Sequence, residues 1–186
     1  SLLGFMQESA GFSADELGFG YDIIKKHNIG FIMSGWYLEL NRPIRYGEVL
    51  TVHTWPVRPN NVIFLRDFEL YVGYEKVGAA VSRWCMMDVV AFKIMPVMSF
   101  FKNYDLDTWN TERSIEFNRW KIRAEDNVNK VFTHEIGYGD YNHYFHMNNT
   151  RYAGYMLSAF SDKEFKGKYI SKLQISYVKQ CKIGDK

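Results

Sequence analysis

Residues 31–88 form an almost unbroken run of strand-like segments, and this run most limits the folds open to the chain. In the segment 48–55, β-branched and aromatic residues predominate, and successive side chains would face opposite sides of an extended strand. We predict four strands joined by short turns, at 31–40, 48–55, 62–71 and 76–88. Because consecutive strands with short connections pair in antiparallel fashion, the sequence predicts an antiparallel sheet.

A helical segment precedes these strands. Apolar residues recur at roughly helical spacing between positions 2 and 27. Ser13 with Glu16 three residues later is a capping-box pattern, which predicts that the helix restarts there. The polar run 25–28 before Gly30 predicts the end of the helix. A sheet that wraps such a helix leaves a mainly apolar groove between the two, which suits a long, thin, apolar ligand.

The second half of the chain repeats this order of elements. We predict a strand at 131–138, a helix at 149–160 and a strand at 169–179. A shift of 137 residues places Met33 over Ile170 and Leu38 over Ile175. The shared order of elements favours an internal repeat. The alternative is that the similarity arises by chance, because any two helix–strand units can look this similar.

The predicted elements divide the chain into three parts. The first unit spans 1–101, and the second spans 131–186. Between them, charged residues at 102–130 are interspersed with Trp109 and Trp120, which favours a partly ordered linker.

The composition excludes several classes of protein. With 47% hydrophobic and 24% charged residues among 186, the chain has enough apolar residues for a core, which excludes global disorder, collagen and coiled coil. The net charge of +2 gives no argument for nucleic acid. No apolar run approaches the roughly 20 residues of a membrane span, and we expect no membrane partner. Two cysteines, Cys85 and Cys181, make no disulfide framework, which favours a cytoplasmic location.

Several short stretches together resemble one family. They lie at 28–36, 47–56, 66–68, 82–84 and 146–152. Two elements within them, Thr-Trp-Pro at 54–56 and His-x-Asn-Asn at 146–149, are fairly specific when they occur together. Through these elements the chain resembles the bacterial acyl-acyl-carrier-protein thioesterases. The resemblance extends over almost the whole chain.

The resemblance implies a fold and a reaction. The fold would be α+β, a tandem (double) hot-dog in which each unit is a long helix wrapped by an antiparallel sheet, with the second unit incomplete at its C-terminal end. The reaction would be hydrolysis of fatty acyl thioesters on acyl carrier protein, without metal or organic cofactor. A homodimer is also compatible with this reading.

The chain departs from the family motif at its acidic positions. The family pattern is Asp-x-Asn-x-His-x-Asn-Asn, but Asn142 stands at the Asp position and Tyr144 at the Asn position. A further family Glu is matched by Gln180, which is followed by Cys181. Two hypotheses follow: a thioesterase that keeps His146, or a catalytically weak or inactive acyl-binding relative that lost the carboxylates.

Each candidate site residue has a functional and a structural interpretation. His146 is the candidate base, since imidazole titrates near neutrality, or else a member of an aromatic cluster. Asn142 would orient His146 or a water, and Tyr144 would donate a hydrogen bond to an oxyanion or only pack. Cys181 is a candidate nucleophile if His146 lies within reach, and otherwise a packed residue. Asp140 either supplies the missing carboxylate or is a solvated turn residue.

The helix start and a lysine-rich segment complete the candidate features. Asn148 and Asn149 fit the cap and first turn of the predicted helix, whose free N–H groups would hold a carbonyl oxygen. Four lysines between 163 and 172 would steer the acidic acyl carrier protein, or simply keep a loop soluble.

Overall fold

The computed structural model describes residues 1–123, 126, 132–142 and 146–186. The helices are α1 (Leu2–Glu16), α2 (Tyr21–Lys26), α3 (Met98–Phe101), α4 (Asn149–Leu157) and α5 (Asp162–Phe165), with 3-10 turns η1 (Leu106–Thr108) and η2 (Tyr138–Asp140). The strands are β1 (Ile29–Leu40), β2 (Leu50–Pro56), β3 (Ile63–Val72), β4 (Glu75–Asp88), β5 (Lys93–Met95) and β6 (Lys172–Ser176).

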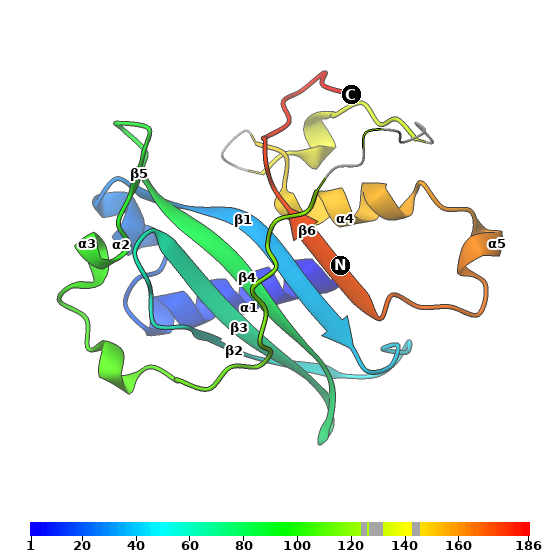
Figure 1. Ribbon diagram of the computed structural model, residues 1–186, viewed down its shortest axis with the longest axis horizontal. Helices are drawn as coiled ribbons and strands as arrows, with labels where there is room; N and C mark the ends of the chain where they lie inside the picture. Colours follow the sequence, from blue (N-terminus) through cyan, green and yellow to red (C-terminus); the bar gives the residue numbers. More distant parts are fainter. Residues whose placement is uncertain (124–125, 127–131, 143–145) are drawn as a thin grey trace.

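All six strands belong to one antiparallel sheet, in the order β2-β3-β4-β1-β6 with β5 paired to β4 (Figure 1). The four strands predicted in the first half are confirmed within about two residues of their observed ends. The helix predicted at 149–160 is confirmed as α4, and the last predicted strand is confirmed as the shorter β6.

Two local predictions are wrong. Helix α1 continues through Ser13 to Glu16, and the N–H of Leu17 still bonds to the carbonyl of Ser13, so no new helix begins there. The described residues of the strand predicted at 131–138 form no strand. Their chain turns at η2 instead, because the Asp140 carboxylate accepts the N–H of Gly137.

The core lies between α1 and the sheet. Leu3, Met6 and Ala10 of α1 are buried against strand residues that include Trp36 and Phe68, whose ring centroids lie 5.2 Å apart. Burying a large apolar side chain contributes roughly 1.5–3 kcal/mol, so this contact fixes α1 on its face of the sheet.

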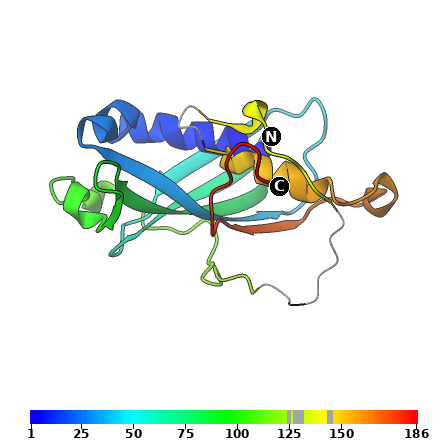
Figure 2. The same cartoon turned by 90° about the horizontal axis from the view of Figure 1, so that it is seen from above.

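Figure 2 shows α1 and α4 on one face of the sheet. The linker begins on that face, where Leu106 and Trp109 are buried beside Phe64, and it then passes to the other face (Figure 2).

Strands β1 and β6 pair antiparallel and join the two predicted units into one sheet. Tyr37 lies opposite Gln174 in this pairing. Hydrogen bonds extend the pairing at both ends. The N–H of Tyr177 bonds to the carbonyl of Ser34 at 3.0 Å, and the N–H of Leu40 bonds to the carbonyl of Ser171 at 2.7 Å.

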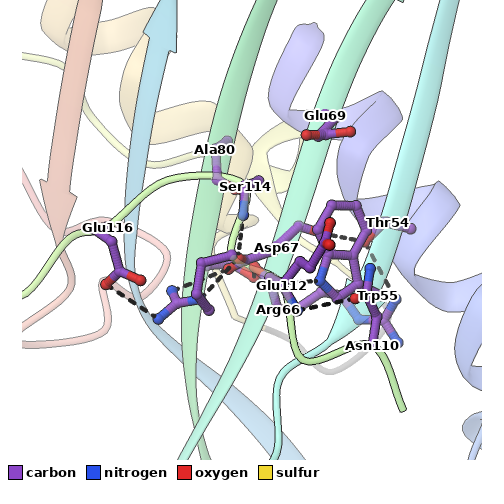
Figure 3. A network of polar contacts seen from close by, with 12 residues as sticks. Thr54, Trp55, Arg66, Asp67, Glu69, Ala80, Asn110, Glu112, Ser114 and Glu116 are labelled. Carbon is purple, nitrogen blue, oxygen red and sulfur yellow. Dashed lines mark hydrogen bonds and ion pairs between the residues drawn. The ribbon is translucent and has the colours of Figure 1, made fainter. Parts of the chain in front are cut away.

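The linker crosses the outer face of the sheet (Figures 1 and 2). Ser114 donates its N–H to Asp67 in the sheet at 2.8 Å and its hydroxyl to the carbonyl of Ala80 at 3.0 Å (Figure 3). Further along, Phe117 stacks on Tyr37 with ring centroids 3.8 Å apart. The linker is therefore ordered over this stretch, as the sequence predicted.

Gly35 lets the linker and β6 approach the sheet closely. A Cβ at this position would lie 2.9 Å from the carbonyl oxygen of Ile175 and 3.0 Å from the Trp120 ring. Any side chain here would therefore separate the linker or β6 from β1. Within the described ranges, no helix has the length and apolar character needed to cross a membrane.

Candidate functional site

The first residues of α4 are ordered by their own side chains. Asn148 caps the helix, and its Oδ1 accepts the N–H and the hydroxyl of Thr150, each at 3.0 Å. The cap predicted from the sequence is therefore confirmed. Asn149 follows, and its Oδ1 is buried without a hydrogen-bond partner among the described residues.

A cavity of about 610 Å³ lies between the start of α1 and α4, beside β1 and β6. The N-terminus of α1 and helix α4 are neighbours in both views (Figures 1 and 2). The apolar part of the wall comes from Leu2, Leu3, Leu38, Leu40, Leu157, Ile170 and Leu173. The polar part comes from the first two turns of α4, namely Asn148, Thr150, Arg151 and Tyr155. The volume of the cavity is within the range of roughly 300–1,000 Å³ that is typical of small-molecule sites.

A second groove of about 550 Å³ runs along the other side of α1, against β2. Phe5 and Phe12, which are 61% and 70% exposed, lie on its helical side, and Leu50 and Val52 lie on its strand side. The two spaces share Ser1 and Leu2, so α1 separates two apolar surfaces that meet at its first turn.

Beside the cavity, one buried carboxylate collects three donors. Asp140 accepts the N–H of Gly137 at 3.0 Å and the hydroxyl of Tyr155, and its Oδ2 lies 3.1 Å from Nε2 of His134. The His134 and Tyr155 rings stack with centroids 3.8 Å apart. The hydrogen bond from Tyr155, with help from Gly137 and His134, lowers the pKa of Asp140 to about 2.

The burial of Asp140 contradicts one of its two interpretations. Asp140 is 7% exposed and fully partnered, so it is not a solvated turn residue. Its carbonyl also accepts the N–H of Asn148 at 2.8 Å, which joins it to the cap of α4. His134 is the residue that sequence reasoning missed, and its only signal was a histidine six positions before an aspartate.

Asn142 and His146 are brought together by a turn of the main chain. The N–H of Asn142 bonds to the carbonyl of His146 at 2.9 Å, and the N–H of His146 bonds to Oδ1 of Asn142 at 3.3 Å. His146 is exposed, and this contact uses its backbone instead of its imidazole. Tyr144, predicted as an oxyanion donor, lies outside the described residues.

Gln180 and Cys181 lie on the segment after β6. Gln180 is exposed, whereas Cys181 is half-buried and donates its N–H to the Tyr152 hydroxyl at 3.3 Å. Burial and the contact with Cys181 raise the pKa of Tyr152 to about 12. Among the described histidines, none contacts Cys181, so the predicted partnership with His146 is not formed there.

Most of the lysines predicted to attract acyl carrier protein are free of ion pairs among the described residues. Lys163, Lys166 and Lys168 are exposed, and Lys172 pairs with Glu39 at 2.8 Å. In the part of the chain that the structure describes, no three His, Cys, Asp or Glu side chains are placed to share a metal ion.

The sheet with a helix in each unit and the apolar cavity between the units define a tandem hot-dog protein. Family models give the particular family. The acyl-ACP thioesterase N-terminal domain matches residues 1–103, and the C-terminal domain of the same family matches residues 122–186. The chain belongs to the acyl-ACP thioesterase family.

Solved structures show the same fold at low sequence identity. The chain is similar to an acyl-ACP thioesterase from Bacteroides thetaiotaomicron, with a TM-score of 0.84 and 24% identity, over 99% of this chain and 74% of that one. It is also similar to a putative oleoyl thioesterase from Lactobacillus plantarum, with a TM-score of 0.84 and 17% identity, over 98% and 72%. The 12:0-ACP thioesterase from Umbellularia californica matches with a TM-score of 0.80 and 16% identity, over 98% and 75%. No curated protein matches the chain.

Proposed function

We propose that the protein hydrolyses fatty acyl thioesters of acyl carrier protein and releases the free fatty acid. The observation that carries this proposal is the cavity whose walls are apolar on the sheet side and polar at the first turns of α4. An acyl chain would lie along Leu38, Leu40 and Leu173, and its thioester would lie at Asn148 and Thr150. Family membership supports the same reaction.

The start of α4 suits the charge that develops during hydrolysis. Attack on a thioester carbonyl moves negative charge onto its oxygen, and a helix N-terminus offers free N–H groups with a positive dipole end. The thiolate leaves readily, so the reaction depends mainly on activation of the attacking water. In this arrangement α4 provides the electrostatic stabilisation and the apolar wall provides the binding energy.

The resemblance places the chemistry at His146, Asn142, Tyr144 and Gln180, and Cys181 beside Gln180 is a separate candidate nucleophile. Asn142 and Gln180 are amides, which neither accept a proton nor attack a carbonyl at neutral pH. We therefore propose that they orient water or the thioester and do not act as bases. Among these family positions, His146 carries the one imidazole.

The partner in this proposal is acyl carrier protein in the cytoplasm. Its acidic surface would approach the exposed lysines at 163, 166 and 168, which lie between α4 and β6. Such steering raises the association rate and weakens with salt.

Incubation of the protein with acyl carrier proteins that carry chains of 8 to 18 carbons tests the proposal. We expect catalytic release of free fatty acid, with a preference for one chain-length range. Stoichiometric or no release from any of these substrates would reject it.

A second function has an observation of its own in its favour. Both acidic positions of the family motif are amides, and His146 is exposed. A protein that binds acyl chains without turnover would keep the cavity under these changes. Equilibrium binding of a fluorescent fatty acid, together with absence of turnover in the assay above, would favour this acyl-binding function.

A further inference from the structure

We infer that His134, oriented by the buried carboxylate of Asp140, is the general base that activates water for thioester hydrolysis. This inference rests on the proposed function and names a residue outside the family motif for its central step. The geometry that points to it is the contact of Nε2 with Oδ2 of Asp140 at 3.1 Å, beside a residue of the cavity wall.

The hydrogen bonds of Asp140 determine which nitrogen of His134 is available. An ionised carboxylate only accepts hydrogen bonds, and Asp140 already receives one from Gly137 and one from Tyr155. The contact at Nε2 must therefore be donated by the imidazole, which places its proton on Nε2. In the neutral ring, Nδ1 is then the nitrogen with a free lone pair, as a base requires.

A buried carboxylate that accepts a hydrogen bond from one ring nitrogen orients the imidazole, so that the other nitrogen can take a proton. Asp140 is well suited to this role, since its side chain is 9% exposed and its position is fixed by the cap of α4. It would also stabilise the imidazolium that forms after proton uptake.

His134 lies behind the cavity wall, in contact with one of the wall residues. Its ring stacks on Tyr155, which belongs to the polar wall of the cavity, with centroids 3.8 Å apart and an interplanar angle of 20°. The His134 side chain is 32% exposed, so water reaches it. A water held between this imidazole and the start of α4 would face a thioester bound there.

The other described histidines have no such hydrogen bond, although His53 on β2 lies opposite Glu69 on β3 and interacts with its charge. His27 and His53 make ring contacts with Phe100 and Tyr71, and His146 is exposed and held through its main chain. Within the described ranges, His134 is the histidine with a carboxylate oxygen at hydrogen-bonding distance.

The step balances with water as the second reactant. Nδ1 of His134 takes a proton from water while the water oxygen bonds to the thioester carbonyl carbon. The carbon–sulfur bond then breaks, and its electron pair leaves with the thiolate. The imidazolium returns its proton to that sulfur, and a fatty acid and a thiol are released.

Steady-state kinetics of His134→Gln test the inference, with His53→Gln as the matched control because His53 is exposed on β2, away from the cavity. We expect His134→Gln to lower kcat by about 10²–10⁴-fold, with KM changed by less than about threefold. Asp140→Asn should lower kcat by at least about 10-fold. The control should keep the wild-type rate.

Two further readouts separate catalysis from structure. The acid limb of the wild-type pH–rate profile should disappear in His134→Gln, and added imidazole should partly restore His134→Gly. If His134→Gln does not fold, diethyl pyrocarbonate treatment of the wild-type protein decides the matter: activity should fall in step with modification of His134 mapped by mass spectrometry.

The outcomes distinguish this inference from the proposed function. Wild-type protein without turnover would reject both. Turnover in the wild type that persists in His134→Gln, or after modification of His134, would overturn the inference alone. Loss of turnover in His146→Gln with full activity in His134→Gln would assign the base to the family position instead.

Discussion

Arg113 on the linker donates two hydrogen bonds to Asp67 on β3, from Nε at 2.8 Å and from Nη2 at 3.2 Å. The Asp67 side chain is fully buried and also receives the N–H of Ser114 (Figure 3). A carboxylate without access to water needs such partners, because an uncompensated buried charge is strongly destabilising. This contact therefore fixes where the linker crosses the sheet on its way to the second unit.

We predict that Arg113→Met lowers the free energy of unfolding by about 3–5 kcal/mol, because it leaves the Asp67 charge buried without its cation. Urea unfolding followed by tryptophan fluorescence measures this change.

Glu116→Gln is the matched control for that variant. Glu116 lies 3.9 Å from the same guanidinium, but its side chain is 83% exposed. Its loss should change the unfolding free energy by less than about 1 kcal/mol. Equal effects of the two variants would contradict the assigned role of the buried carboxylate.

The sheet could be predicted because its information is local. Strand β4 was expected at 76–88 and is observed at Glu75–Asp88, since alternation and turn residues are visible within a few positions. The tandem arrangement could also be predicted from the repeated order of elements, and β1 pairs with β6 between the two predicted units. The pairing of two strands in a hairpin can be predicted without knowing which distant residues contact them.

The contacts of the candidate site and linker could not be predicted in the same way. Arg113 is one of several cations in the linker, and only the folded chain shows which of them meets Asp67. The described part of the strand expected at 131–138 is not a strand, and its Ile136 bonds instead to Asp185 and Gly184 of the C-terminal segment. The dyad of His134 and Asp140 depends on the turn that replaced that strand.

A second prediction concerns chain length. Gly154 of α4 lines the cavity, and a Cβ there would meet no atom within 4 Å. Gly154→Leu should therefore occupy the cavity without disturbing the helix and shift the preference toward shorter acyl chains. Competition between acyl carrier proteins of different chain lengths measures the shift.

Gly11→Leu provides the comparison for that variant. Gly11 lies inside α1, also meets no atom within 4 Å and lines neither groove. It should gain similar helical stability, on the order of 1 kcal/mol or less, without a change in chain-length preference. A proportional change of rate for all chain lengths in Gly154→Leu would exclude this cavity as the acyl site.

A third prediction follows from the low pKa of Asp140. A carboxyl whose folded pKa is about 2, below its ordinary value of 3.8, adds stability above pH 3.8 and loses it as the pH falls toward 2. Tyr155→Phe removes the largest cause of that shift. Its urea midpoint should therefore lie below that of the wild type at pH 6, and the difference should narrow as the pH falls toward 3.

Tyr138→Phe is the control, since Tyr138 belongs to the same turn but is 85% exposed. It should follow the wild type at every pH. A difference for Tyr155→Phe that stays constant from pH 6 to pH 3 would mean that the lost hydroxyl acts by packing and not through the ionisation of Asp140.

The last prediction concerns Cys181. A cysteine nucleophile needs a base within hydrogen-bond reach, yet Cys181 meets the hydroxyl of Tyr152, both through its backbone N–H and through its side chain. That hydroxyl, with its pKa raised to about 12 by burial and by Cys181, stays protonated at neutral pH and takes no proton from a thiol. Cys181→Ala should therefore keep the rate within about threefold, since water is the attacking group in the proposed reaction. Loss of more than about 10²-fold, or a burst of thiol release with an acylated Cys181 found by mass spectrometry, would instead show a covalent route.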